Sequence, residues 1–233
     1  SFRGRQLFDW IYRKKVDDFT KMTDIPKLLQ EKFKVYSLHP LKILKTDRSK
    51  SKKTQKYLFT TKNGMTIESV LMRKKDRATI CLSTQVGCAV DCSFCATAKM
   101  GFVQNLSVGE IVDQYFQLAK LSDTKITNVV FMGMGEPLLN IDELLLSIRS
   151  INKDFEISQR KITVSTVAIP KMISKLSEMS FQVLGKCQFT LAISLHASNQ
   201  EIREIIIPSA KKYHIQNIID DCRQFVKKTG RRV

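Results

Sequence analysis

Apolar residues in the second half of the chain occur as short runs that alternate with stretches of helical spacing. The short runs predict four strands, at residues 79–83, 128–132, 162–166 and 189–196. The stretches of helical spacing predict four helices, over residues 108–121, 141–152, 170–179 and 214–229. Strands that alternate with helices are typical of a parallel sheet covered by helices. Residues 78–233 are therefore predicted to form an α/β domain of βα units, either a partial barrel or an open sheet.

Residues 1–40 are predicted to form a small helical module. Leu7, Trp10 and Ile11 fall on one face of a helix. Asp24 followed by Pro26 predicts the N-cap and the first turn of a second helix.

Residues 41–77 are predicted to contain a linker and a β-hairpin. A polar, lysine-rich stretch covers residues 47–53, and two β-type segments flank the pair Asn63-Gly64. Asn-Gly between two such segments is a strong signal for a hairpin turn. The hairpin is therefore expected directly before the α/β domain.

Charge adds an expected partner to this picture. The 233 residues include 39 Lys and Arg against 22 Asp and Glu, which gives a formal net charge of +17. Such a chain is expected to bind a polyanion, although charge alone does not separate RNA from DNA, or either from a merely solvated basic surface. No run approaches the roughly 20 apolar residues of a membrane span, and the first residues lack the pattern of a secretory signal. The sequence predicts a cytoplasmic protein.

Three of the six cysteines lie within eight residues, at Cys88, Cys92 and Cys95. Three thiolates on one loop can hold a [4Fe-4S] cluster and leave one iron open to a ligand, whereas a structural zinc ion takes four protein ligands. Cys81 is the candidate fourth ligand for zinc, although it is predicted to lie on a strand. The spacing therefore predicts an iron–sulfur site and leaves a zinc site as the alternative.

Further candidate residues follow the predicted strands, where each strand ends. Gly135 and Glu136 belong to a glycine-rich turn after the second predicted strand. The third and fourth predicted strands end in Ser165, Thr166, Ser194, Leu195 and His196. Because the carboxyl ends of parallel strands meet at one edge of a sheet, these residues are expected to line one ligand-binding rim. Each of them alone would more often be an ordinary turn or hydrogen-bonding residue.

The cysteine spacing and its place in the chain resemble the radical S-adenosylmethionine (SAM) superfamily. In that superfamily the triad follows the first strand of a partial TIM-type (βα) barrel, and an aromatic residue, here Phe94, precedes the last cysteine. The resemblance implies that Cys88, Cys92 and Cys95 hold a [4Fe-4S] cluster and that SAM binds the open iron. It also implies that the glycine-rich turn holds the amino group of SAM.

Four segments are similar to a narrower family. CLSTQVGC at 81–88, FMGMGEPLLN at 131–140, ITVST at 162–166 and AISLHA at 192–197 resemble the dual-specificity adenine-C2 methyltransferases of 23S rRNA and tRNA, the RlmN family. Pro137 favours this family over the related enzymes that methylate C8 of the same adenine. The resemblance spans nearly the whole chain. It implies that SAM is contacted by Gly135, Glu136, Ser165, Ser194, Leu195 and His196.

The RlmN resemblance also implies two catalytic residues. Cys81 matches the cysteine that resolves a covalent RNA–protein adduct through a transient disulfide, and Glu68 matches the proton acceptor. Without the family, Glu68 would be an ordinary exposed carboxylate on a strand. The motif of the cysteine that carries the methyl group does not occur up to Val233, and Cys187 and Cys222 are predicted to be small buried side chains instead. The barrel is therefore expected to continue past Val233, and this chain to bind cluster and cofactor without turning over.

RNA contacts are expected from the helical module and from the basic segment at 41–53, because reaching a base in folded RNA requires phosphate contacts and an extruded nucleotide. Each basic residue alone would more often be a solvated charge. The candidates are Arg13, Lys14, Lys15, Lys50, Lys52 and Lys53. An external electron donor and a monomeric state complete the prediction. Two alternatives stay open: a non-catalytic, zinc-containing RNA-binding module, and a radical enzyme that acts on a peptide or small molecule.

Overall fold

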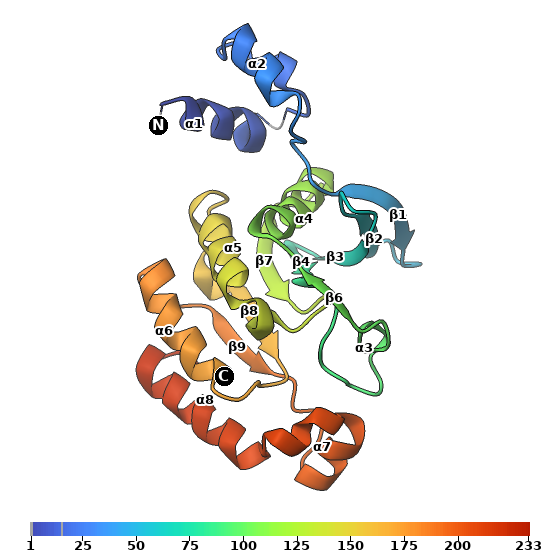
Figure 1. The fold of residues 1–233 in the computed structure, drawn as a ribbon, viewed down its shortest axis with the longest axis vertical. Helices are drawn as coiled ribbons and strands as arrows, with labels where there is room; N and C mark the ends of the chain where they lie inside the picture. The colour runs from blue at the N-terminus through green and yellow to red at the C-terminus, as the bar shows by residue number, and fades with distance from the viewer. Residues whose placement is uncertain (1, 15) are drawn as a thin grey trace.

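The computed structural model describes residues 2–14 and 16–233. Its centre is a mixed seven-stranded sheet with the strand order β1-β2-β3-β4-β7-β8-β9 (Figure 1). The strands are β1 (Lys42–Arg48), β2 (Thr54–Thr60), β3 (Thr66–Lys74), β4 (Arg77–Leu82), β7 (Ile126–Phe131), β8 (Ile162–Thr166) and β9 (Thr190–Ile193). Strands β1 to β4 pair antiparallel, and β4, β7, β8 and β9 pair parallel. This parallel-rich sheet confirms the predicted α/β class.

Four long helices follow the parallel strands. They are α4 (Val108–Leu121), α5 (Ile141–Lys153), α6 (Met172–Leu184) and α8 (Ile215–Thr229). Neighbouring helices pack side by side in this order, and α4, α5 and α6 form a layer along one side of the sheet (Figure 1). The predicted strands at 79–83, 128–132 and 162–166 are confirmed as β4, β7 and β8. The predicted helices are confirmed as well, with α6 reaching past its predicted end at residue 179.

The two faces of the sheet differ in burial, as expected when only one face packs against helices. The face toward the helices carries the main core, which includes Phe59, Ile67, Leu71, Ile80, Leu82, Val129, Phe131, Val164 and Leu191. The other face, called the inner face below, carries half-exposed residues that pair across the strands. They include Leu58, Glu68, Val70, Val130, Thr163, Ser165, Thr190 and Ala192. Side chains on the inner face can therefore reach a bound ligand.

The fourth predicted strand is wrong at its end. β9 stops at Ile193, so that Ser194, Leu195 and His196 lie in the loop that follows. The amide of Ser194 still donates to the carbonyl of Thr166 at 2.7 Å, but the amide of Leu195 turns back to the carbonyl of Ile193 at 3.0 Å. His196 then adopts a left-handed conformation with φ of +62°. Because this conformation does not fit a strand, pairing ends here.

Several elements were not predicted. β1 lies in the segment interpreted as a linker, and a second, two-stranded sheet joins β5 (Gln85–Gly87) to β6 (Phe102–Asn105). The helices α3 (Ala96–Lys99) and α7 (Gln200–Ile206) were missed as well. The predicted hairpin is confirmed as β2 and β3, with Gly64 at φ of +77° in its turn. Since β3 also pairs with β4, the hairpin is part of the central sheet.

The helical module contains α1 (Phe2–Phe8), a π-helical turn (Asp9–Arg13), a 3-10 turn (Phe19–Lys21) and α2 (Lys27–Phe33). The predicted N-cap at Asp24 is wrong, because Pro26 occupies the cap position of α2 and no side chain caps that helix. The Asp24 carboxylate instead accepts a hydrogen bond from the indole N–H of Trp10. None of the helices in residues 2–14 and 16–233 is both long and apolar enough to cross a membrane. The domain boundaries at residues 40 and 77 stay predictions.

The helical module packs against the helix layer through Tyr12. Its ring centroid lies 5.6 Å from that of Phe116 on α4 and 5.4 Å from that of Phe155, both in edge-on contacts. His39, at the end of the module, adds a contact between its Nδ1 and the Asp113 carboxylate at 2.8 Å. These contacts fasten the module to the sheet domain.

Phe131→Ala is expected to lower the free energy of unfolding by about 3–5 kcal/mol, because a buried aromatic ring leaves a cavity when it is removed. Phe131 is 0% exposed at the end of β7, in the main core. Phe2→Ala is the control, since Phe2 is 71% exposed, and its effect should stay within about 0.5 kcal/mol. Urea unfolding measures both, and equal effects would contradict this placement of the core.

Candidate active site

The three clustered cysteines lie on one loop, the cysteine loop, which runs from β5 to α3. Burial, and then the neighbouring thiols of Cys95 and Cys88, raises the pKa of Cys92 to about 11. The thiols therefore converge where three separate anions are unfavourable, and a positively charged metal group would reverse this preference. The cysteine loop packs in an apolar cluster, separate from the main core, that includes Val90, Val167, Ile169, Ile206, Ile207 and Ala210.

Backbone contacts fasten the cysteine loop at two places. A Cβ atom on Gly87 would lie 1.7 Å from the carbonyl oxygen of Gly101, and the amide of Cys88 donates to the same oxygen at 3.0 Å. Gly87 also has φ of +71°, so only glycine fits there without strain. Further along, the amide of Ser93 donates to the carbonyl of Ile206 at 2.9 Å. The loop is thereby held between the β5–β6 pair and α7.

The position of Cys81 does not support the zinc alternative. Cys81 lies on β4, in register with Val70 and Val130, and outside the apolar cluster of the cysteine loop. In the part of the chain that the structure describes, no three His, Cys, Asp or Glu side chains are close enough to hold a single ion. Tetrahedral zinc needs every sulfur at about 2.3 Å from one ion, whereas a four-iron cluster takes each cysteine on a different iron and so permits wider spacing.

The glycine-rich turn after β7 packs directly against the segment that precedes the cysteine loop. A Cβ atom on Gly133 would lie 2.6 Å from the hydroxyl oxygen of Ser83, and one on Gly135 would lie 2.5 Å from Cβ of Gln85. The amide of Glu136 donates to Oε1 of Gln85 at 2.8 Å. The turn therefore requires glycine at both positions, because a side chain would collide with Ser83, Leu82 or Gln85.

Glu136 is only 2% exposed, and the protein itself engages both oxygens of its carboxylate. Oε1 accepts from the amide of Leu138 and Oε2 from the amide of Val167, both at 3.0 Å. Burial raises the pKa of Glu136, and hydrogen bonds from Val167, Leu138 and Thr166 oppose that shift. The carboxylate fastens the loop after β7 to the loop after β8.

Glu136→Gln is expected to lower the free energy of unfolding by roughly 1–3 kcal/mol near pH 5, because an amide cannot accept from both backbone N–H groups. The folded protein keeps the Glu136 proton to a higher pH than the unfolded chain does, since burial raises the pKa. Protonation of Glu136 therefore stabilises the folded protein. This stabilisation is complete below the ordinary glutamate pKa of about 4.3 and is lost as the pH rises through the raised pKa of the folded state.

The difference between wild type and Glu136→Gln should therefore narrow as the pH rises from acid to alkaline. Urea unfolding at several pH values measures this difference. The exposed Glu201 provides the control, because Glu201→Gln should have little effect at any pH. A difference that widens with pH would contradict the effect assigned to burial.

Residues from the end of β8 and from the loop after β9 meet at the same edge of the sheet. The hydroxyl oxygens of Ser165 and Ser194 are 3.0 Å apart. The ring of His196 packs edge-on against Phe94 of the cysteine loop, with 4.7 Å between the ring centroids. Of the predicted rim residues, His196 thus lies directly against the cysteine loop.

Glu68 and Cys81 lie on the inner face, on β3 and β4. The carbonyl of Glu68 accepts from the hydroxyl of Ser83 at 2.6 Å, which links it to the glycine-rich turn. Its carboxylate pairs with Lys56 of β2 at 2.8 Å. Burial raises the pKa of the Cys81 thiol to about 11, and the backbone of Met132 opposes that shift. Cys81 is therefore a protonated thiol at neutral pH.

Comparison with known proteins identifies the family. Residues 82–231 match the model of the radical SAM superfamily, and residues 1–37 match the model described as the ribosomal RNA large subunit methyltransferase N-terminal domain. Proteins named probable dual-specificity RNA methyltransferase RlmN are similar over 100% of this chain, at 58% identity in Prochlorococcus marinus subsp. pastoris and 44% in a Synechococcus species. The chain belongs to the RlmN family. It spans 68% and 67% of the lengths of these two relatives.

A solved structure agrees with the radical SAM fold of this RlmN family member. The crystal structure of a radical SAM methyltransferase from Sphaerobacter thermophilus matches with a TM-score of 0.90 and 39% sequence identity. The match covers 100% of this chain and 68% of that protein. The predicted resemblance to the RlmN family is confirmed.

Three residues hold the ligand-binding rim in place but were not predicted from the sequence: Ser83, Gln85 and Asn140. The side-chain amide of Asn140 donates to the carbonyls of Thr84 at 2.9 Å and Leu106 at 2.8 Å. All three lie inside the segments that resemble the family, so the resemblance could have pointed to them. Polarity alone could not, because turn residues are commonly polar.

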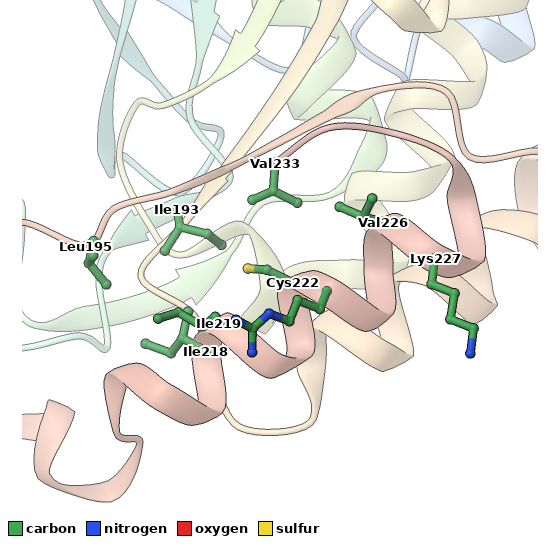
Figure 2. A pocket seen from close by; sticks show the side chains of 9 residues that line it. Ile193, Leu195, Ile218, Ile219, Cys222, Val226, Lys227 and Val233 are labelled. Carbon is green, nitrogen blue, oxygen red and sulfur yellow. The ribbon is translucent and has the colours of Figure 1, made fainter.

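The remaining cysteines lie elsewhere. All six cysteines are free, and the transient disulfide of Cys81 stays a prediction. Cys187 is buried as predicted, whereas Cys222 is only half-buried. Cys222 lines a cavity of about 650 Å³ between α8 and the end of β9, and its sulfur points toward the side of the cavity formed by Ile193 (Figure 2). The cavity is mostly apolar and is lined by Ile193, Leu195, Ile218, Ile219, Cys222, Arg223, Val226, Lys227 and Val233.

The predicted RNA-contacting residues of this RlmN family member lie at two places. On the helical module, Arg13 is 3.2 Å from the carboxylate of Asp9, and Nζ of Lys14 lies 3.3 Å from the ring centroid of Trp10. Lys15 lies outside the described residues. The turn between β1 and β2 carries the exposed Lys50, Lys52 and Lys53.

Proposed function

We propose that this protein methylates C2 of an adenine in 23S rRNA and in tRNA, using a [4Fe-4S] cluster and SAM. One observation carries the proposal: the cysteine loop, the glycine-rich turn and the loops after β8 and β9 lie next to one another at the carboxyl ends of parallel strands. When bound, the cluster and SAM supply radical chemistry. C2 of adenine needs it, because this carbon is not nucleophilic enough for polar methyl transfer.

The residues present fit both cofactors. Cys88, Cys92 and Cys95 would hold the cluster, since their thiols converge in an apolar surrounding. The glycine-rich turn is held tightly against Ser83 and Gln85, which fixes its backbone beside the cysteine loop. SAM would contact the glycine-rich turn and the neighbouring rim through Gly135, Glu136, Ser165, Ser194, Leu195 and His196.

Glu68 and Cys81 would act on the RNA from the inner face. Glu68 is half-exposed on β3 and can accept a proton from a base placed over that face. Cys81 would resolve the RNA–protein adduct, and its raised pKa means that its proton must be removed first. The methyl-carrying cysteine is expected outside residues 1–233, because neither Cys187 nor Cys222 lies in the sequence motif of that cysteine.

The net charge of +17 supports an RNA substrate, with phosphates held by basic residues of the helical module and of the β1–β2 turn. An external one-electron donor would reduce the cluster. Six free cysteines are typical of a reducing compartment, which supports a cytoplasmic location. A monomeric state completes the proposal.

Nucleoside analysis of the product tests this function. The complete protein, with whatever precedes or follows residues 1–233, is reconstituted anaerobically and incubated with SAM, dithionite and either a 23S rRNA fragment or a tRNA. Mass spectrometry of the digested RNA should find C2-methyladenine. C8-methyladenine would assign the related activity, and RNA binding by a zinc-containing protein without methylation would assign the non-catalytic module.

A further inference from the structure

Arg203 of α7 is a charged side chain that is only 1% exposed. Nη1 donates to the carbonyl of Leu195 at 2.9 Å and Nη2 to the carbonyl of Val167 at 2.8 Å, whereas Nε has no hydrogen-bond partner. Arg203 takes part in none of the ion pairs found within residues 2–14 and 16–233. A buried cation without a counter-anion costs free energy, and buried arginines are normally paired. Among the described residues, Arg203 is therefore a buried cation with no protein carboxylate paired to it.

Arg203 lies between the rim and the cysteine loop. Its two carbonyl partners follow β8 and β9, the strands that carry the predicted SAM contacts. Val167 packs in the same apolar cluster as Cys92, and the amide of Ser93 donates to the carbonyl of Ile206 on α7. Burial lowers the pKa of Arg203, and negative charge on Cys92 opposes that shift. Through Val167 and the end of α7, the guanidinium is therefore held beside the cysteine loop.

The nearest rim carboxylate does not serve as the counter-anion. Glu136 accepts from the amide of Val167, whereas Arg203 donates to the carbonyl of Val167, and the two charged groups form no ion pair. Burial also raises the pKa of Glu136, which favours the neutral carboxylic acid over the charged carboxylate. The remaining anionic group near Arg203 would be the metal-bound cysteine loop.

We propose that Arg203 is a positioning residue whose buried positive charge compensates the negative charge of the cluster held by Cys88, Cys92 and Cys95 and favours its reduction. The inference rests on the proposed function, because it presupposes the cluster. Three thiolates make such a cluster anionic, and its net charge becomes more negative by one when it accepts an electron from the external donor, with no bond broken. A fixed cation in a dry surrounding stabilises the reduced state and raises the reduction potential.

Redox titration of the reconstituted protein with dithionite, followed by electron paramagnetic resonance (EPR), tests this role. At the potential where the wild-type cluster is half reduced, Arg203→Gln should lower the ratio of reduced to oxidised cluster about tenfold, which is 59 mV for a one-electron couple. Arg203→Lys keeps the charge and should stay within about twofold of wild type. Arg149→Gln removes an exposed cation from α5 and should also stay within about twofold, because solvent screens that charge.

A purely structural role for Arg203 would lower the stability of both variants and leave the ratio unchanged, which would overturn the proposal. Arg203→Met is the second neutral variant if Arg203→Gln does not fold. Failure of both neutral variants to fold, while Arg203→Lys folds with an altered potential, would overturn it as well. Wild-type protein that takes up no iron would instead contradict the proposed function. If the wild type binds the cluster and Arg203→Gln leaves the reduction potential unchanged, this inference alone would be overturned.

Discussion

Cys92→Ala should abolish incorporation of the iron–sulfur cluster. Cys92 is buried among the apolar residues of the cysteine loop, and its thiol converges with those of Cys88 and Cys95. With one of three ligands removed, two thiolates cannot hold a [4Fe-4S] cluster that already has one iron without a protein ligand. Iron and sulfide content after anaerobic reconstitution measures the effect, and the expected loss is essentially complete.

Cys222→Ala is the matched control for Cys92→Ala. Cys222 is a free, half-buried thiol on α8, outside the cysteine loop. Its removal should leave iron and sulfide at the wild-type level. Equal retention of iron in both variants would show that the cysteine loop does not hold the metal.

Glu68→Gln should lower the rate of C2-methyladenine formation roughly 10²–10⁴-fold, the usual range for loss of a general base. An amide of the same shape keeps the packing on β3 but cannot take up a proton. The cluster and its response to SAM should not change, because the Glu68 side chain contacts Lys56 and not the cysteine loop. Mass spectrometry of digested RNA measures the rate, in the complete protein.

Glu178→Gln controls for loss of an ion-paired carboxylate. Glu178 pairs with Lys228 at 3.2 Å between α6 and α8. This pair is exposed, so its removal should change the rate by no more than about twofold. If Glu68→Gln retained the wild-type rate, another group would have to accept the proton.

The regular elements of this fold could be predicted because their signals are local. In β8, the buried Ile162 and Val164 alternate with half-exposed Thr163 and Ser165, which is the period of a strand with one covered face. β1 carries no such signal, since every one of its residues is exposed. It is a strand because β2 offers it hydrogen bonds. That contact is tertiary, and local sequence does not encode it.

The candidate site likewise has one part that local sequence predicts and one part that depends on tertiary contacts. The spacing of the three cysteines is a local pattern, and it pointed to the metal chemistry directly. The fit of Gly133 against Ser83 and of Gly135 against Gln85 joins residues far apart in the chain. Only the fold reveals why those glycines are required.

Arg203 shows a further limit of prediction from sequence. It lies in α7, a short helix that the periodicity of the chain does not indicate. An arginine between glutamates and isoleucines is typical of a solvated helix surface. Its burial depends on the loops after β8 and β9 and on the cysteine loop, which are brought together only in the folded protein.

EPR spectroscopy of the anaerobically reconstituted, dithionite-reduced chain, with and without SAM, tests the central claim most directly. The account predicts a signal from a reduced [4Fe-4S] cluster that shifts when SAM is added, because three cysteines leave one iron open to the cofactor. A chain that holds zinc and gives no iron signal would contradict the account.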